Sequence, residues 1–264
     1  MFSSPRKEHA PPDAEAVMAL VIILKCLFVK HLASPPVEYL AECKKRWTVD
    51  EWNKFLYGEQ SRNEQLIERL RRAGLWTAMD QKERGFMEAQ SINLTQQAHV
   101  DVSWSVESII CLLWALGYLL EFPRYDEQVD PDLINKLPAE PPEILMKTAV
   151  LKQHELIERQ RDVAELWHWR SRTRQLQEKG HKFVLPGNWT IEEIIRTAAT
   201  RAAENGIIPA PIGDDFPAFG KAYRDLTHQE YSQATSIAME RHRAFNWLCG
   251  FAPDNRWEET PTDT

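Results

Sequence analysis

The chain has 264 residues, of which 43% are hydrophobic and 27% charged, and its formal net charge is -7. This composition is that of a globular protein long enough to bury a core without disulfides or metal. An acidic chain does not suit the phosphate backbone of nucleic acid, so we expect no nucleic-acid partner. The four cysteines form no C-x-x-C pair and lie in apolar surroundings, which favours reduced thiols and a cytoplasmic location.

The first apolar segment, residues 16–29, follows a tail at residues 1–13 that mixes proline, serine and charge. This tail is predicted to be disordered, with Asp13 as the cap of a helix over residues 14–32. The apolar run is too short to span a bilayer and contains Lys25. We therefore expect a helix of the protein core and no membrane partner.

Four capping boxes give the strongest local signal for helices. In each, a Ser or Thr lies three residues before a Glu, so that two backbone N–H groups of the first helical turn are satisfied reciprocally. The four pairs are Thr48 and Glu51, Ser61 and Glu64, Thr190 and Glu193, and Thr227 and Glu230. We expect a helix to begin at each of these positions.

The helix around which the chain is organised is expected over residues 103–120. Apolar residues occupy every face of this stretch, which is typical of a buried helix. A single carboxylate, Glu107, follows Trp104 by one turn and precedes Trp114 by two turns, so all three lie on one stripe. Because a carboxylate is almost never buried alone, Glu107 is expected to pair with a basic residue from another segment.

The remaining elements are also predicted to be helical, because no segment sustains the alternation of a β-strand. Further helices are expected over residues 37–46, 61–74, 142–179 with a break near 150–153, 190–204 and 227–249, with irregular loops at 124–142 and 207–221. The predicted fold class is all-α: a single compact multi-helix domain over residues 14–264, with a central buried helix and long loops.

The helix expected after residue 153 carries a group of arginines: Arg159, Arg161, Arg170, Arg172 and Arg174. The simpler interpretation is a basic face in contact with solvent. The alternative is that one of these arginines turns inward and neutralises Glu107.

Three patches of the sequence resemble a known family. They are residues 107–117 with the motif LLWALG, His168-Trp169 with Arg172, and Glu240-Arg241-His242 followed by Asn246-Trp247 and by Thr262-Asp263-Thr264. The patches are collinear, and over residues 14–264 the chain resembles proteins that carry the domain of unknown function 4272. This resemblance implies a largely bacterial, intracellular family without an assigned activity.

The candidate site consists of polar residues and tryptophans from these regions. The polar set, predicted to form an internal network or a pocket, is Glu107, Asp162, His168, Arg172, Glu240, Arg241, His242, Asn246 and Asp263. The aromatic lining is predicted to be Trp104, Trp114, Trp169, Trp247 and Trp257. The partners expected for Glu107 are, in order, Arg241, His242 and Arg172. Two roles stay open for the polar set, the fixing of helix register and the binding of a ligand.

Metal and catalytic signatures are incomplete. Glu165-x-x-His168 has the spacing of one half of a ferritin-like di-metal site, but the second half is missing. His154 and Glu158 lie on one helical face without a convincing third zinc ligand. We therefore expect no metal and no cofactor.

The predicted function is that of a cytoplasmic binding or interaction protein with a protein partner, of the immunity or accessory type found in bacterial conflict systems. The acidic charge, the many aromatic residues and the lack of a catalytic motif favour this function. The alternative is a metal-assisted hydrolase that uses the Glu, Asp and His residues of the polar set. The residues alone name neither a substrate nor a partner.

Overall fold

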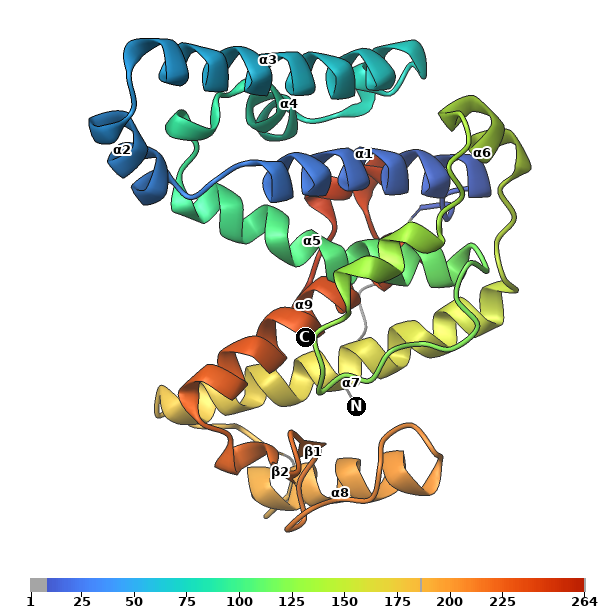
Figure 1. Ribbon diagram of the computed structural model, residues 1–264. Helices are drawn as coiled ribbons and strands as arrows, with labels where there is room; N and C mark the ends of the chain where they lie inside the picture. The colour runs from blue at the N-terminus through green and yellow to red at the C-terminus, as the bar shows by residue number, and fades with distance from the viewer. Residues whose placement is uncertain (1–8, 186, 264) are drawn as a thin grey trace. The chain divides into compact units, whose positions relative to one another are not determined.

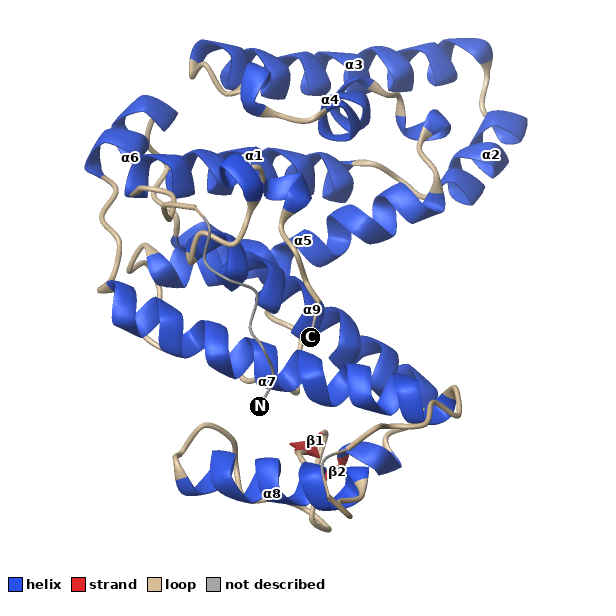
Figure 2. Cartoon of the chain, turned by 180° about the vertical axis from the view of Figure 1, so that it is seen from behind, coloured by secondary structure: helices blue, strands red, loops and turns tan. Residues whose placement is uncertain are grey.

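The structure, a computed structural model, describes residues 9–185 and 187–263. This part of the chain is mainly helical (Figure 1), which confirms the all-α class. Its only paired strands are the two-residue β1 (Pro217–Ala218) and β2 (Lys221–Ala222), drawn in red in Figure 2. They interrupt the loop predicted at residues 207–221.

The chain divides into two compact units. Of the described residues, unit 1 comprises 9–11, 121–130, 152–185 and 187–263, and unit 2 comprises 12–120 and 131–151. Each unit is described by itself, and the expectation of one domain over residues 14–264 stays a prediction. Of the tail predicted to be disordered, residues 1–8 lie outside the described residues.

Unit 2 is built around α1 (Ala14–Ala33) and α5 (Gln96–Ala115), which pack against each other. Helix α1 also contacts three further helices, because its apolar residues cover all of its faces. The other elements of unit 2 are α2 (Val37–Arg46), α3 (Val49–Arg72), η1 (Trp76–Ala78), α4 (Gln81–Glu88), η2 (Ser91–Asn93), η3 (Pro131–Lys136) and α6 (Pro142–Thr148).

Helix α5 is buried as predicted, but its bounds differ from residues 103–120. It begins earlier because Thr95 accepts a hydrogen bond from the backbone N–H of Ala98 and caps the helix. It ends before Gly117, whose φ of 81° is a left-handed conformation that glycine adopts at little cost. The first turns of α5 were missed because they are polar and carry no apolar periodicity.

Helix α1 is long and apolar enough to cross a membrane, since its 20 residues include a window of mean hydropathy 2.1. The expectation that this segment is too short is therefore wrong. A core helix passes the same test, and 61% of the window is buried inside the protein. Near the end of α1, Lys30 donates hydrogen bonds to the carbonyl oxygens of Met87 and Ala89 at 2.7 and 2.6 Å. This burial favours the predicted core helix.

Unit 1 is built around α7 (His154–Glu178) and α9 (His228–Leu248), which lie side by side (Figures 1 and 2). The predicted break near residues 150–153 is confirmed, because α6 ends at Thr148 and α7 begins at His154. The other elements of unit 1 are α8 (Ile191–Glu204), η4 (Tyr223–Asp225), η5 (Pro253–Asn255) and η6 (Trp257–Glu259).

Three of the four predicted capping boxes are confirmed, those that begin with Thr48, Thr190 and Thr227. The box at Ser61 is wrong, because Ser61 lies inside α3. A box that the sequence analysis missed begins α4, where the capping side chain is that of Asp80.

Candidate functional site

Arg241 of α9 holds a loop of unit 1. Its side chain has no exposed surface, and its guanidinium donates hydrogen bonds at 3.1, 2.7 and 3.1 Å to the carbonyl oxygens of Pro123, Arg124 and Glu127. The guanidinium also lies 4.8 Å from the ring centre of Tyr125. Arg241 thus fixes residues 123–127 against α9.

His242, the next residue, faces α7. Its Nδ1 lies 3.0 Å from Nδ1 of His168, so one ring donates a hydrogen bond to the other. His242 is 0% exposed and His168 is 8% exposed. Burial, reinforced by the nearby Arg172, lowers the pKa of His168 to about 4. Burial, reinforced by His168 and Arg161, lowers the pKa of His242 to about 3.

Asn246 lies one turn after His242 and joins α9 to α7 and to the C-terminal segment. Its Oδ1 accepts a hydrogen bond from Nε of Arg161 at 3.0 Å, and its amide donates to the carbonyl oxygen of Pro261 at 2.8 Å. Arg161 also forms an ion pair of 2.7 Å with Glu165. Arg241, His242 and Asn246, three nearby residues of α9, therefore contact three different parts of unit 1.

Three other predicted residues lie at the edge of this network. Asp162 is exposed and forms an ion pair of 3.3 Å with Arg161. Arg172 and Asp263 are also exposed, and both act on His168: Arg172 lowers its pKa and Asp263 raises it. Arg172 and Asp263 therefore act on His168 from the protein surface, whereas Asp162 contacts the network only through Arg161.

Glu107 belongs to α5 of unit 2 and has no exposed surface, which confirms its predicted burial. On the same helix, Trp114 is buried and Trp104 is partly exposed. Glu240 is partly exposed on α9 of unit 1. The pairing of Glu107 with a basic residue stays a prediction for all three candidates, Arg241, His242 and Arg172.

The predicted tryptophans of unit 1 are buried in its core. Trp247 and Trp257 meet edge to face with ring centres 5.9 Å apart, and the indole N–H of Trp247 donates to the carbonyl oxygen of Asn255 at 2.8 Å. Trp169 lies 6.3 Å from the ring of Phe216. All three tryptophans anchor segments of unit 1 to one another.

The interpretation of α7 as a solvated basic face is wrong for Arg161 and Arg170, which are both buried. Arg170 is 1% exposed and donates two hydrogen bonds of 2.6 Å to the carboxylate of Asp215. The sequence analysis missed this ion pair because Asp215 lies in a loop far along the chain. Arg161 could have been found, because it precedes His168 by seven residues and so lies on the same helical face.

A cavity of about 370 Å³ lies beside the loop that Arg241 holds. Its walls come from residues 122–126, from α7, from residues 205–207 and 209, and from Pro217 of β1. Tyr125 of the loop and Trp167 of α7 stack with ring centres 5.7 Å apart and an angle of 4° between the rings. The cavity was not predicted, because its lining comes from four segments that are distant in sequence.

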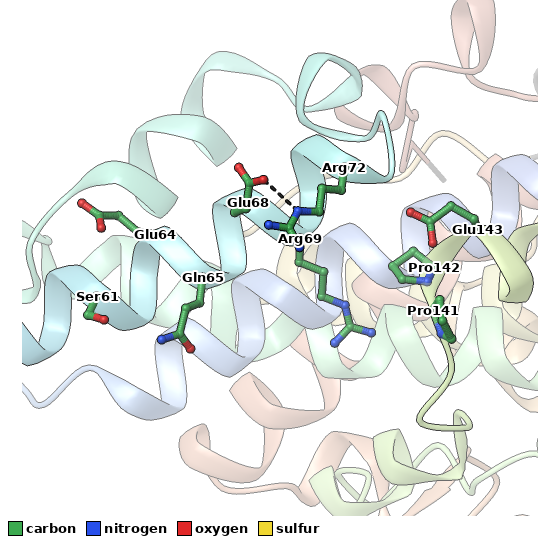
Figure 3. Close-up of a pocket in the computed structure, with 9 residues that line it drawn as sticks. All are labelled: Ser61, Glu64, Gln65, Glu68, Arg69, Arg72, Pro141, Pro142 and Glu143. Atoms are coloured by element: carbon green, nitrogen blue, oxygen red, sulfur yellow. Dashed lines mark hydrogen bonds and ion pairs between the residues drawn. The ribbon is translucent and has the colours of Figure 1, made fainter.

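Unit 2 has a more open groove of about 560 Å³ between α3 and the start of α6 (Figure 3). Figure 3 shows Arg69 extending toward Pro141 and Pro142, and Glu68 bound to Arg72. Five of its nine lining residues are exposed charged side chains of both signs, and four of these five belong to α3. This mixture of charges does not favour one class of ligand.

The surroundings of His168 and His242 favour a structural role for these residues over a role in acid–base catalysis. A general base works best when its pKa lies near 7, whereas the pKa values of His168 and His242 lie at about 4 and 3. Both rings are therefore neutral at pH 7 and remain so in mild acid. The hydrogen bond between the two rings joins α7 to α9.

Residues 45–185 match the family model described as "Domain of unknown function (DUF4272)". The comparisons with curated proteins and with solved structures give no match. The matched segment includes Trp104, Glu107 and His168, whereas the Glu240-Arg241-His242 motif follows it. Because the match covers more than half of the 264 residues, the chain belongs to the family of proteins that carry the domain of unknown function DUF4272.

Proposed function

We propose that this protein is a cytoplasmic bacterial binding protein, of the immunity or accessory type, that recognises a protein partner through the 370 Å³ cavity of unit 1. One observation carries the proposal. The buried Arg241 holds the loop at residues 123–127 through three carbonyl groups, and this loop places Tyr125 on Trp167. The polar network thereby maintains a preformed cavity, and preformed sites lose less entropy on binding.

The lining of the cavity fits a segment of a protein partner. Tyr, Trp and Arg are the residues enriched at the energetic centres of protein interfaces, and this cavity contains all three types. At its rim Arg124 pairs with Asp126, whereas Arg159 is exposed and forms no ion pair with another described residue. The partner segment is therefore expected to place an acidic side chain beside an apolar one.

The hydrolase alternative would use the Glu, Asp and His residues of the polar set, among which His168 has Glu165 at the spacing of metal ligands. Glu165 lies 2.7 Å from Arg161, and His168 contacts His242, so both side chains are engaged inside the protein. These contacts favour a structural role for the two residues, and binding is the function that the geometry supports better.

Two isoleucines of unit 1 provide a matched test. Ile207 lines the cavity and is 37% exposed, whereas Ile212 lies outside it and is 39% exposed. Tagged wild-type protein, Ile207→Glu and Ile212→Glu should be purified from the native cell, with co-purifying proteins quantified by mass spectrometry. We expect one partner that is retained by Ile212→Glu and reduced at least about tenfold by Ile207→Glu, the effect of losing ~1.4 kcal/mol.

A partner that Ile207→Glu retains would exclude this cavity as the site. A purified protein that turns over a small substrate, with no partner in the native cell, would contradict the binding function itself.

A further inference from the structure

Unit 1 has a second, smaller cavity of about 200 Å³, whose walls come from α7, the first turns of α8, residues 214–215 and Arg224 of η4. It shares no lining residue with the 370 Å³ cavity. Its 200 Å³ correspond to about seven molecules of liquid water at ~30 Å³ each, and are less than the roughly 300–1,000 Å³ of sites for drug-sized ligands. The cavity therefore has room for a small molecule and not only for one ordered water.

One wall of this cavity holds a buried donor without an acceptor. Arg170 is 1% exposed, and its Nε and Nη2 both donate to the carboxylate of Asp215 at 2.6 Å. That carboxylate also accepts from the backbone N–H groups of Phe216 and Arg224, at 2.8 and 3.0 Å, which uses its remaining acceptor capacity. The third nitrogen of Arg170, Nη1, is buried and has no hydrogen-bond partner among the described residues. Because an unpaired buried donor is unfavourable, we expect Nη1 to take an oxygen acceptor from within the cavity.

The charges around the cavity have both signs, with three arginines and four carboxylates in the lining. Arg170 and Asp215 neutralise each other, and Glu193 accepts from the backbone N–H and the hydroxyl of Thr190 in the capping box of α8. The other charged residues are exposed and carry two charges of each sign: Arg196, Arg224, Glu192 and Asp214. A site for a simple anion such as phosphate would have an excess of positive charge, which this lining lacks.

Asp214 presents a carboxylate at the rim of the cavity. Its φ of 63° is a left-handed conformation, which Asp adopts more readily than most residues, in a turn where Ile212 and Asp215 exchange backbone hydrogen bonds of 3.1 Å. Asp214 forms no ion pair with another described residue. Its carboxylate is therefore available to a positively charged group of a ligand.

We propose that this cavity binds a small zwitterion, an α-amino acid, whose carboxylate accepts a hydrogen bond from Nη1 of Arg170 and whose ammonium group faces Asp214 and Glu192. The carboxylate supplies the acceptor that Nη1 lacks, and the two acidic side chains match the ammonium group. The ion pair with Asp215 holds the guanidinium in place before binding, which reduces the entropy lost. Nη1 is covered by its surroundings, so an exposed side chain of the rim, such as that of Arg224, turns aside when the ligand enters.

Thermal unfolding of the full-length protein, measured with each common L-α-amino acid in turn, tests the proposal. A ligand that binds only the folded protein raises the melting temperature. Acetate and methylammonium are the control ligands, because each carries only one of the two charged groups. We expect a saturable rise with at least one amino acid and a smaller rise, or none, with either control ligand.

The affinity of that amino acid should then be measured by calorimetry for the wild type, Asp214→Asn and the matched control Asp225→Asn. Asparagine tolerates the left-handed backbone at position 214, and Asp225 is exposed outside the cavity. We expect Asp214→Asn to weaken binding at least about threefold, the effect of losing ~0.7 kcal/mol, and Asp225→Asn to leave the affinity unchanged. Unchanged affinity in Asp214→Asn would contradict the proposed position of the ammonium group.

A crystal structure with the bound amino acid tests the role of Arg170 without a substitution of this buried residue. We expect a carboxylate oxygen of the ligand at a hydrogen-bond distance of roughly 2.7–3.2 Å from Nη1. The proposal would be overturned if no amino acid raised the melting temperature, if acetate raised it equally, or if the ligand carboxylate lay away from Nη1.

Discussion

Arg241 carries a charge at a position without exposed surface, and three carbonyl groups compensate for its burial. Arg241→Met keeps much of the volume but leaves these carbonyl oxygens without their donor. We expect this change to lower the free energy of unfolding by about 3 kcal/mol, measured by urea denaturation. Arg201→Met, on the exposed surface of α8, is the control and should change it by less than about 0.5 kcal/mol. Equal losses in the two variants would contradict the structural role of Arg241.

Because His168 and His242 are buried together, we expect the stability of the protein to depend on pH. The pKa values of His168 and His242 in the folded protein, about 4 and about 3, lie below the ordinary value of 6.5. Above pH 6.5 both rings are neutral in the folded and unfolded states, so their contribution to stability is complete. Below pH 6.5 the histidines of the unfolded chain bind protons while those of the folded chain stay neutral. The free energy of unfolding therefore falls, down to about pH 4 for the contribution of His168 and about pH 3 for that of His242.

Each histidine should contribute a slope of up to about 1.4 kcal/mol per pH unit in that range. His242→Asn should therefore show a shallower loss of stability than the wild type between pH 6.5 and 4.5, measured by urea denaturation at several pH values. Carboxylates that titrate in the same range are common to both proteins, so the difference reports the histidine. Parallel curves for the two proteins would contradict the lowered pKa of His242.

The sequence identified the polar residue types of the network but not their partners. The motif Glu240-Arg241-His242 predicted side chains pointing in successive directions around a helix, and the structure gives Arg241 and His242 different partners. Arg241 binds carbonyl groups, which every residue carries, so no sequence pattern could name the loop at residues 123–127. Asp215, the partner of Arg170, was missed for a different reason: it lies in a loop 45 residues further along the chain.

Helices α7 and α9 are each followed, two residues after their last residue, by a glycine in the left-handed conformation, Gly180 with φ 67° and Gly250 with φ 80°. A Cβ at Gly180 would meet nothing within 4 Å, whereas a Cβ at Gly250 would lie 2.5 Å from the carbonyl oxygen of His9. Gly180→Ala should cost about 1 kcal/mol of unfolding free energy through backbone strain alone. Gly250→Ala should cost at least about 1 kcal/mol more, because the backbone of residues 9–11 has to shift.

Thermal or urea denaturation of the two alanine variants measures this difference directly. Similar losses in both would show that residues 9–11 do not pack against the end of α9 in solution.

Helix positions were predictable where local chemistry decides them and less so elsewhere. Capping boxes placed the starts of α3, α8 and α9, because the cap and its partner are only three residues apart. The capping box predicted at Ser61 was wrong, because a Ser three residues before a Glu also occurs inside helices. Helix α3 continues through Ser61. The early start of α5 was missed because polar residues in a first turn leave no apolar stripe.

The fold class followed from composition and periodicity, since the chain has helical signals throughout and no sustained alternation. The division into two units and the positions of the cavities could not be predicted in this way, because each cavity is lined by segments separated by many residues. The cavity in unit 1 needs the loop at residues 123–127 to lie against α7, and that placement depends on Arg241.

The role of Arg241 in shaping this cavity can be tested by a crystal structure of Arg241→Lys. Lysine keeps the charge, but its single nitrogen cannot replace the fork of donors that reaches three carbonyl groups. We expect residues 123–127 to move and Tyr125 to leave Trp167, while the contact between His168 and His242 persists. A structure in which the loop keeps its position and Tyr125 still stacks on Trp167 would contradict the role of Arg241 and the preformed binding cavity proposed from it.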